Sequence, residues 1–133
     1  MRAILIDSEH EDIREVVIDQ NQRVLDQWYD LLDCSLVETA VIINATDFIL
    51  VDEEGSITQK DNYHFFSYEG AHQPFFWGKG LVVGGNEQGA TIDCVSSVED
   101  IKSKVRFVSE KEVLDYYYDA RQQEERAYSK RSS

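Results

Sequence analysis

The chain has 133 residues, 42% of them apolar and 11% aromatic, and a formal net charge of −13. One domain is the norm at this length, and this composition can fill one core, which argues against a disordered chain. The sequence excludes a membrane-spanning helix, because no stretch approaches ~18 uninterrupted apolar residues. It also excludes direct nucleic-acid binding, because its Lys and Arg residues are not clustered.

Two short strands and a helix are expected in the first 33 residues. Residues 3–7 and 15–19 are β-branched runs separated by a polar loop, a pattern typical of neighbouring strands. Residues 19–33 place apolar side chains on one helical face, with Trp28 as the simplest core anchor. The Asp19 and Gln22 pair, or Asn21 alone, is the expected N-terminal cap.

The next segment predicts two further strands, over residues 35–42 and 47–57. The second ends in an acidic turn that needs Gly55 for a positive φ angle. Residues 58–74 follow with no clean periodicity, so we predict a long loop there.

The segment FFWGKGLVVGGNEQG, residues 75–89, holds five of the seven glycines. It fits neither the phosphate-binding loop, since Lys79 is followed by Gly80, nor the dinucleotide-binding glycine pattern. We therefore predict a core strand over Leu81–Val83 and a turn over Gly84–Gly89.

The remainder predicts a strand over residues 90–95, a short helix and a helical tail. Ser97 and Asp100 have capping-box spacing, and Val98, Ile101 and Val105 lie on one helical stripe. The same spacing precedes the tail, whose apolar stripe fades beyond Ala120. We expect that tail either to fray or to meet a partner.

These elements define an α+β fold. We predict a mixed or antiparallel sheet of about five to six short strands with one helix packed on it, a short second helix and a C-terminal helical tail. The predicted boundaries are a single domain over residues 1–108 and a helix with a frayed polar tail over residues 109–133.

Motifs for catalysis, metal binding and cofactor binding are not recognisable in the sequence. Cys34 and Cys94 lack metal-ligand or redox spacing, so we predict two reduced, packed thiols. His64, Glu69 and His72 lack the helical spacing of a zinc site, and the acidic turn lacks the ligand ladder of a calcium loop. We predict no catalytic residue, no metal, no cofactor and no enzymatic activity.

Candidate binding residues fall into three groups: the aromatic segment with Lys79, the acidic turn, and the tail. Aromatic side chains serve both as core fillers and as interface anchors, and core packing is the default alternative for this set. The candidates are Tyr63, Phe65, Tyr68, Phe75, Trp77, Lys79, Asp52, Glu53, Glu54, Tyr116 and Tyr118.

The run from Asp26 to Phe107 resembles a family of small proteins that bacteriophages and other mobile elements carry and that is defined only as a domain of unknown function. The similar segments are LLDCSLVETAVI, ILVDEEGSI, GKGLVVGGNEQG and SSVEDIKSKVRF. The resemblance implies a phage-type accessory gene acting in the cytoplasm of a bacterial host. It implies no catalytic residue.

Charge distribution and resemblance together favour a protein-binding function. Residues 1–70 hold sixteen Asp and Glu against four Lys and Arg. We expect a non-catalytic protein that binds and modulates a host protein, in host takeover or anti-defence. One alternative is binding of a small ligand or nucleotide signal through Trp77 and Lys79. Another is an acidic mimic of nucleic acid. A third alternative is that the acidic face has no binding role and only keeps the protein soluble.

Overall fold

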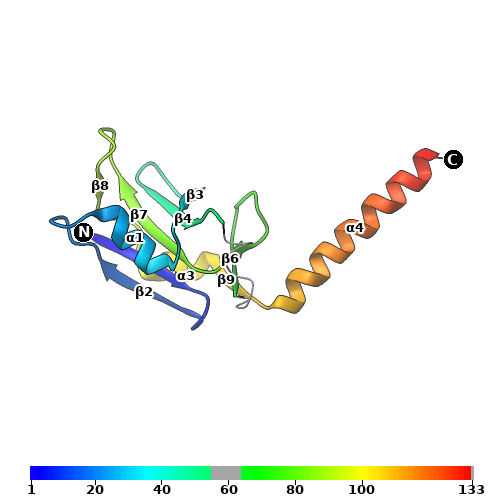
Figure 1. The fold of residues 1–133 in the computed structure, drawn as a ribbon, viewed down its shortest axis with the longest axis horizontal. Helices are drawn as coiled ribbons and strands as arrows, with labels where there is room; N and C mark the ends of the chain where they lie inside the picture. Colours follow the sequence, from blue (N-terminus) through cyan, green and yellow to red (C-terminus); the bar gives the residue numbers. More distant parts are fainter. Residues whose placement is uncertain (55–63, 133) are drawn as a thin grey trace.

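A computed structural model of the chain describes residues 1–54 and 64–132, with the side chains of residues 127–132 left out. The expected glycine turn at Gly55 and the candidate Tyr63 lie outside the described residues. The fold is α+β, as predicted (Figure 1).

The main sheet is antiparallel, with the strand order β2-β1-β7-β4-β3 and with β8 paired to one end of β7. Its six strands are β1 (Arg2–Asp7), β2 (Asp12–Val17), β3 (Val37–Ile42), β4 (Asp47–Asp52), β7 (Gly80–Gly85) and β8 (Thr91–Ile92). β1, β7 and β4 lie at its centre, and their side chains are almost entirely buried. The predicted sheet is therefore confirmed.

A second sheet of three strands, with the order β6-β5-β9, was not predicted. Its strands are β5 (Phe65–Tyr68), β6 (Phe76–Trp77) and β9 (Val105–Val108). The prediction of a continuous loop over residues 58–74 is thus wrong from Phe65 to Tyr68. The assignment of Val105 to a helix is also wrong, because it is the first residue of β9.

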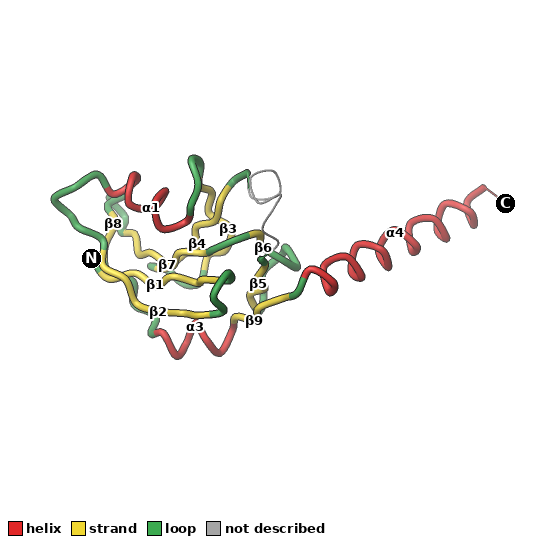
Figure 2. Tube along the Cα trace, turned by 60° about the horizontal axis from the view of Figure 1, so that its bottom comes forward, coloured by secondary structure: helices red, strands yellow, loops and turns green. Residues whose placement is uncertain are grey.

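Two apolar layers lie on opposite faces of the main sheet. One helix lies on each side of this sheet (Figure 2). On one face, helix α1 (Val24–Leu32) packs Leu32 and Trp28 against Leu5 and Leu81. On the other face, helix α3 (Val98–Lys104) contributes Ile101 and the second sheet contributes Phe66, Tyr68 and Phe76. Trp28 thus packs against the core, as predicted, but it is only partly buried.

The predicted N-terminal cap forms at the start of one helix and not at the start of another. The capping box of Ser97 and Asp100 at the start of α3 is confirmed, with both reciprocal hydrogen bonds present. α1 begins after Arg23 without a side-chain cap, so the predicted capping pair does not form. Instead, Asp19 accepts a hydrogen bond from the backbone N–H of Asn21 in the preceding turn.

The glycine-rich segment supplies the central strand β7 and the turn that follows it. The strand is two glycines longer than predicted at its end, because Gly84 and Gly85 pair with β8. A Cβ atom on Gly84 would lie 2.6 Å from the carbonyl oxygen of Asp93, so only glycine allows the strands to approach this closely. The turn ends at Gly89, whose φ is +78°.

Helix α4 (Glu110–Ser132) extends away from the body of the molecule (Figure 1). Its start is anchored by Val113, which is buried with Phe65, Phe75 and Val108. Tyr116 adds an edge-to-face contact with Phe75, with ring centroids 5.2 Å apart. The predicted tail helix is present, and the structure continues it to Ser132.

Candidate functional site

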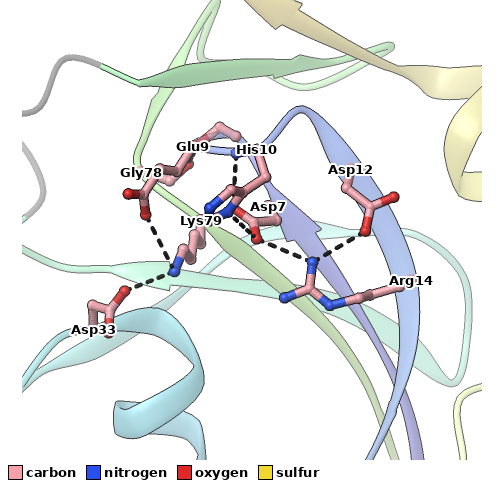
Figure 3. Close-up of polar contacts among 9 residues, drawn as sticks. Asp7, Glu9, His10, Asp12, Arg14, Asp33, Gly78 and Lys79 are labelled. Carbon is pink, nitrogen blue, oxygen red and sulfur yellow. Dashed lines mark hydrogen bonds and ion pairs between the residues drawn. The ribbon is translucent and has the colours of Figure 1, made fainter.

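A cluster of charged side chains closes one end of the layer between the main sheet and α1. Leu5 of β1 and Leu81 of β7 are paired and buried in this layer. Because alternate strand residues share a face, the next side chains on this face are Asp7 and Lys79. Asp33, in the left-handed conformation that ends α1, lies beside them (Figure 3).

Asp7 is the centre of this polar cluster, with a side chain that is only 1% exposed. Its Oδ2 atom lies 2.9 Å from Nδ1 of His10 and 3.0 Å from Nη1 of Arg14, and Oδ1 accepts a hydrogen bond from the backbone N–H of His10 (Figure 3). Burial acts to raise the pKa of Asp7, but hydrogen bonds from His10 and Arg14 outweigh it and hold this pKa below its ordinary value. The carboxylate is therefore ionised at neutral pH.

Lys79 connects the cluster to the end of α1. Its Nζ atom lies 2.7 Å from Oδ2 of Asp33 and 3.8 Å from Oε2 of Glu9 (Figure 3). Burial acts to lower the pKa of Lys79, and the hydrogen bond to Asp33 raises it above its ordinary value. Ser8, also buried, donates a hydrogen bond to the carbonyl oxygen of Gly78, which fixes the turn after β1 against the residue before Lys79.

The polar cluster includes three groups that could together ligate a metal ion. Ligand atoms of Asp7, Glu9 and His10 lie within 4.8 Å of one another. However, Arg14 already bonds the Asp7 oxygen, and Lys79 lies next to Glu9, so an ion would have to displace two cations. We therefore assign the cluster a structural role, in which it ties the β1–β2 turn and the start of β7 to the end of α1.

The aromatic candidates lie mostly inside the protein. Phe65, Tyr68 and Phe75 are buried, so in this structure they pack the core rather than present a surface. Trp77 is half-buried against Phe65, with ring centroids 4.6 Å apart. Lys79 is directed to Asp33 and not towards an aromatic stack.

The acidic turn lies beside a small pocket. Asp52 is buried and accepts a hydrogen bond from the backbone N–H of Glu54, which is half-buried, whereas Glu53 is exposed. The pocket has a volume of about 120 Å³, and its lining includes Trp77 together with the carboxylates Asp52 and Glu53. Its volume is below the ~300 Å³ typical of small-molecule sites, and its carboxylates would repel a phosphate.

Helix α4 exposes an apolar face that includes residues missed in the sequence analysis. Leu114, Tyr117 and Tyr118 are 60%, 50% and 63% exposed. Their i, i+3, i+4 spacing places them on one side of the helix, which we call the tyrosine face. Tyr118 was a candidate. Leu114 and Tyr117 were not, because the sequence pattern groups them with Val113, Ala120 and Arg121 on one side of the helix; in the structure Val113 is buried, whereas Leu114 and Tyr117 are exposed. The candidate Tyr116 lies at the boundary, in contact with both Phe75 and Tyr117.

Fold and site together define a small two-sheet α+β domain with a charged cluster at one end of its core and a projecting helix. Residues 1–106 match the family model described as a domain of unknown function, DUF3846. The chain belongs to this family. Searches of curated proteins and of solved structures gave no match. Among the described residues, the helices are too short or too polar to cross a membrane.

Proposed function

We propose that this protein is a phage-type accessory protein without catalytic activity, which binds a host protein in the bacterial cytoplasm and alters its activity. We further propose that the tyrosine face of α4 makes the contact. The observation that carries the proposal is the exposure of Leu114, Tyr117 and Tyr118 on a helix that contacts the body through Val113 and Tyr116 in its first turns.

Two properties of α4 favour a groove on a partner protein as the binding site. Large apolar side chains at i, i+3 and i+4 are the anchors by which helices bind in grooves, and Tyr is enriched at binding hot spots. Arg121, seven residues after Leu114, lies on the same side of the helix and is exposed. It would contact the polar rim of the partner's groove at the end of the tyrosine face. The partner would therefore have an apolar groove.

The net charge indicates what surrounds that groove. The chain carries −13, and residues 1–70 account for most of it. A basic surface around the groove would be attracted over a distance of about one Debye length, roughly 8 Å at physiological salt, and would accelerate association. Occupation of the groove would block whatever that partner normally binds there.

Site-specific photo-crosslinking tests this proposal. A photoreactive phenylalanine replaces Tyr117 in one protein and Gln123, on the opposite side of α4, in the control. Each protein is irradiated in a lysate of the bacterial host. We expect one host protein to be crosslinked from position 117 and not from position 123.

Binding of that purified host protein is then measured with the double variant Leu114→Gln/Tyr118→Gln. We expect its affinity to fall by at least about 100-fold, which is ~2.7 kcal/mol, since each hot-spot side chain typically contributes ~2 kcal/mol or more. Equal crosslinking from both positions, no crosslink from position 117, or unchanged affinity of the double variant would each refute the proposal.

A further inference from the structure

Strand β3 is an edge of the main sheet. It pairs with β4 on one side, and within residues 1–54 and 64–132 no strand pairs with its other side. Ile42, at the end of β3, is 79% exposed. An unpaired edge offers backbone N–H and C=O groups to an additional strand.

The register with β4 shows which of these backbone groups face outwards. Hydrogen bonds join Glu53 to Leu36 at one end of the ladder and Ile43 to Asp47 at the other. Because hydrogen-bonded and non-hydrogen-bonded pairs alternate in antiparallel sheets, Val37, Thr39 and Ile42 direct their backbone groups away from β4. A β-bulge between Thr39 and Val41 interrupts this edge, so it fits a short added strand.

Pockets lie on both faces of the sheet along this edge. One, of about 450 Å³, is lined by Ala40, Val41 and Ala71, which pack against the core layer that contains α3. The other, of about 360 Å³, includes Phe48, which packs against the layer that contains α1. Thr39 and Ile42 border both pockets. Successive side chains of an added strand would enter the two pockets alternately, because they point to opposite faces.

Charge determines the occupant. Two exposed carboxylates, Glu38 and Glu53, line the small pocket beside Trp77 at one end of this edge. Asp47 borders the 360 Å³ pocket but is buried and accepts hydrogen bonds from Val95 and Ser96. The 450 Å³ pocket includes His72, and the described lining of the three pockets includes neither Lys nor Arg. A second copy of the chain would bring another net charge of −13 to this edge, whereas a basic segment would be attracted.

We infer that the edge of β3 binds a short extended segment of a partner protein, containing basic and apolar residues, by strand addition. This surface is separate from the tyrosine face of α4, and it adds a second mode of protein binding to the proposed function. Backbone hydrogen bonds would supply affinity, and the two pockets would select side chains.

Peptide selection on the intact protein tests the inference. A phage-displayed library of random peptides is selected against the full chain, and the enriched peptide is synthesised and labelled for fluorescence anisotropy. We expect enrichment of Lys or Arg together with β-branched residues. Ile42→Lys places a cation on the binding edge, and Val17→Lys is its matched control, since Val17 is 77% exposed on β2, the opposite edge strand.

We expect Ile42→Lys to weaken binding about tenfold or more and Val17→Lys to change it less than about twofold. Thr39→Pro should also weaken binding, because it removes an outward N–H without breaking the β3–β4 ladder. Bound peptide should slow amide exchange across residues 37–42. The Leu114→Gln/Tyr118→Gln variant should bind the peptide normally, which separates this test from that of α4.

Three results would overturn the inference. One is the absence of any enriched peptide. Another is equal binding of the peptide by the Ile42→Lys and Val17→Lys proteins. The third is a wild-type dimer in light scattering that Ile42→Lys converts to a monomer, because the edge would then be occupied by a second copy.

Discussion

At the scale of single residues, Asp7 explains how a charge is kept inside this fold. Its carboxylate receives hydrogen bonds from the ring and backbone of His10 and from Arg14, which compensates for its loss of hydration. The hairpin of β1 and β2 places Arg14 diagonally opposite Asp7. The sequence analysis predicted the hairpin but began its second strand at residue 15, so it left Arg14 in the loop. The participation of Lys79 and Asp33 depends on contacts far apart in the chain, which local patterns do not contain.

The variant Asp7→Asn tests this account of the buried charge. We expect the free energy of unfolding at pH 7 to fall by about 1–3 kcal/mol, because the amide cannot accept all the charge-assisted hydrogen bonds. Urea denaturation measures the change. Asp12→Asn is the matched control, since Asp12 also binds Arg14 but is half-exposed, and it should cost less than about 1 kcal/mol. Similar losses for the two variants would contradict the assignment of Asp7 as the centre of the polar cluster.

The same pair of proteins gives a pH dependence with a defined sign. The pKa of Asp7 is lowered in the folded protein, so the unfolded chain binds the proton more readily. The stabilisation from its charge is therefore complete above the unfolded pKa of about 3.9 and is lost as the pH falls through the folded value. We expect the stability difference between wild type and Asp7→Asn to shrink below about pH 4 in urea titrations. A difference that grows on acidification would contradict the lowered pKa.

At the scale of elements, the main sheet was predictable and the second sheet was not. β1, β4 and β7 are apolar runs bounded by turn residues, and such runs identify strands locally. β5 contains two adjacent phenylalanines that are both buried, so it lacks the alternation of a half-exposed strand. Its partner β9 lies about forty residues later and begins with Val105, which also continues the helical spacing of α3. Tertiary pairing overrode that local helical pattern.

Truncations of α4 separate its docked start from its projecting part. A chain that ends at Ala120 keeps the buried Val113 and the Tyr116–Phe75 contact. We expect its unfolding midpoint to stay within about 2 °C of the full chain, because residues beyond this point add little to the core. A chain that ends at Val108 loses the burial of Val113 and should be less stable by about 1.5–3 kcal/mol.

Tryptophan fluorescence during thermal unfolding measures both truncated chains, since it reports on the body rather than on α4. The point variant Val113→Ala in the full chain is the control and should reproduce most of the loss seen in the shorter chain. Equal destabilisation by the two truncations would mean that the projecting part of α4 packs on the body.

At the scale of the whole molecule, repulsion among the acidic residues affects the stability of the fold. The net charge is −13, and the charged cluster around Asp7 pairs only some of these carboxylates. Unpaired like charges repel one another in the compact state more than in the expanded unfolded chain. The charge therefore lowers stability and, in our proposal, directs the protein to basic partners.

Salt should consequently stabilise this protein. We expect the urea midpoint of unfolding to rise as NaCl increases from about 10 mM to about 500 mM, since the Debye length falls well below the size of the domain and the repulsion is screened. The matched control is the triple variant Asp30→Asn/Glu38→Gln/Glu11→Gln, which removes three exposed carboxylates from the acidic half. This variant should start with a higher midpoint in low salt and gain less from added NaCl. A midpoint that falls with salt in the wild-type protein would show that its ion pairs contribute more than the repulsion among its acidic residues.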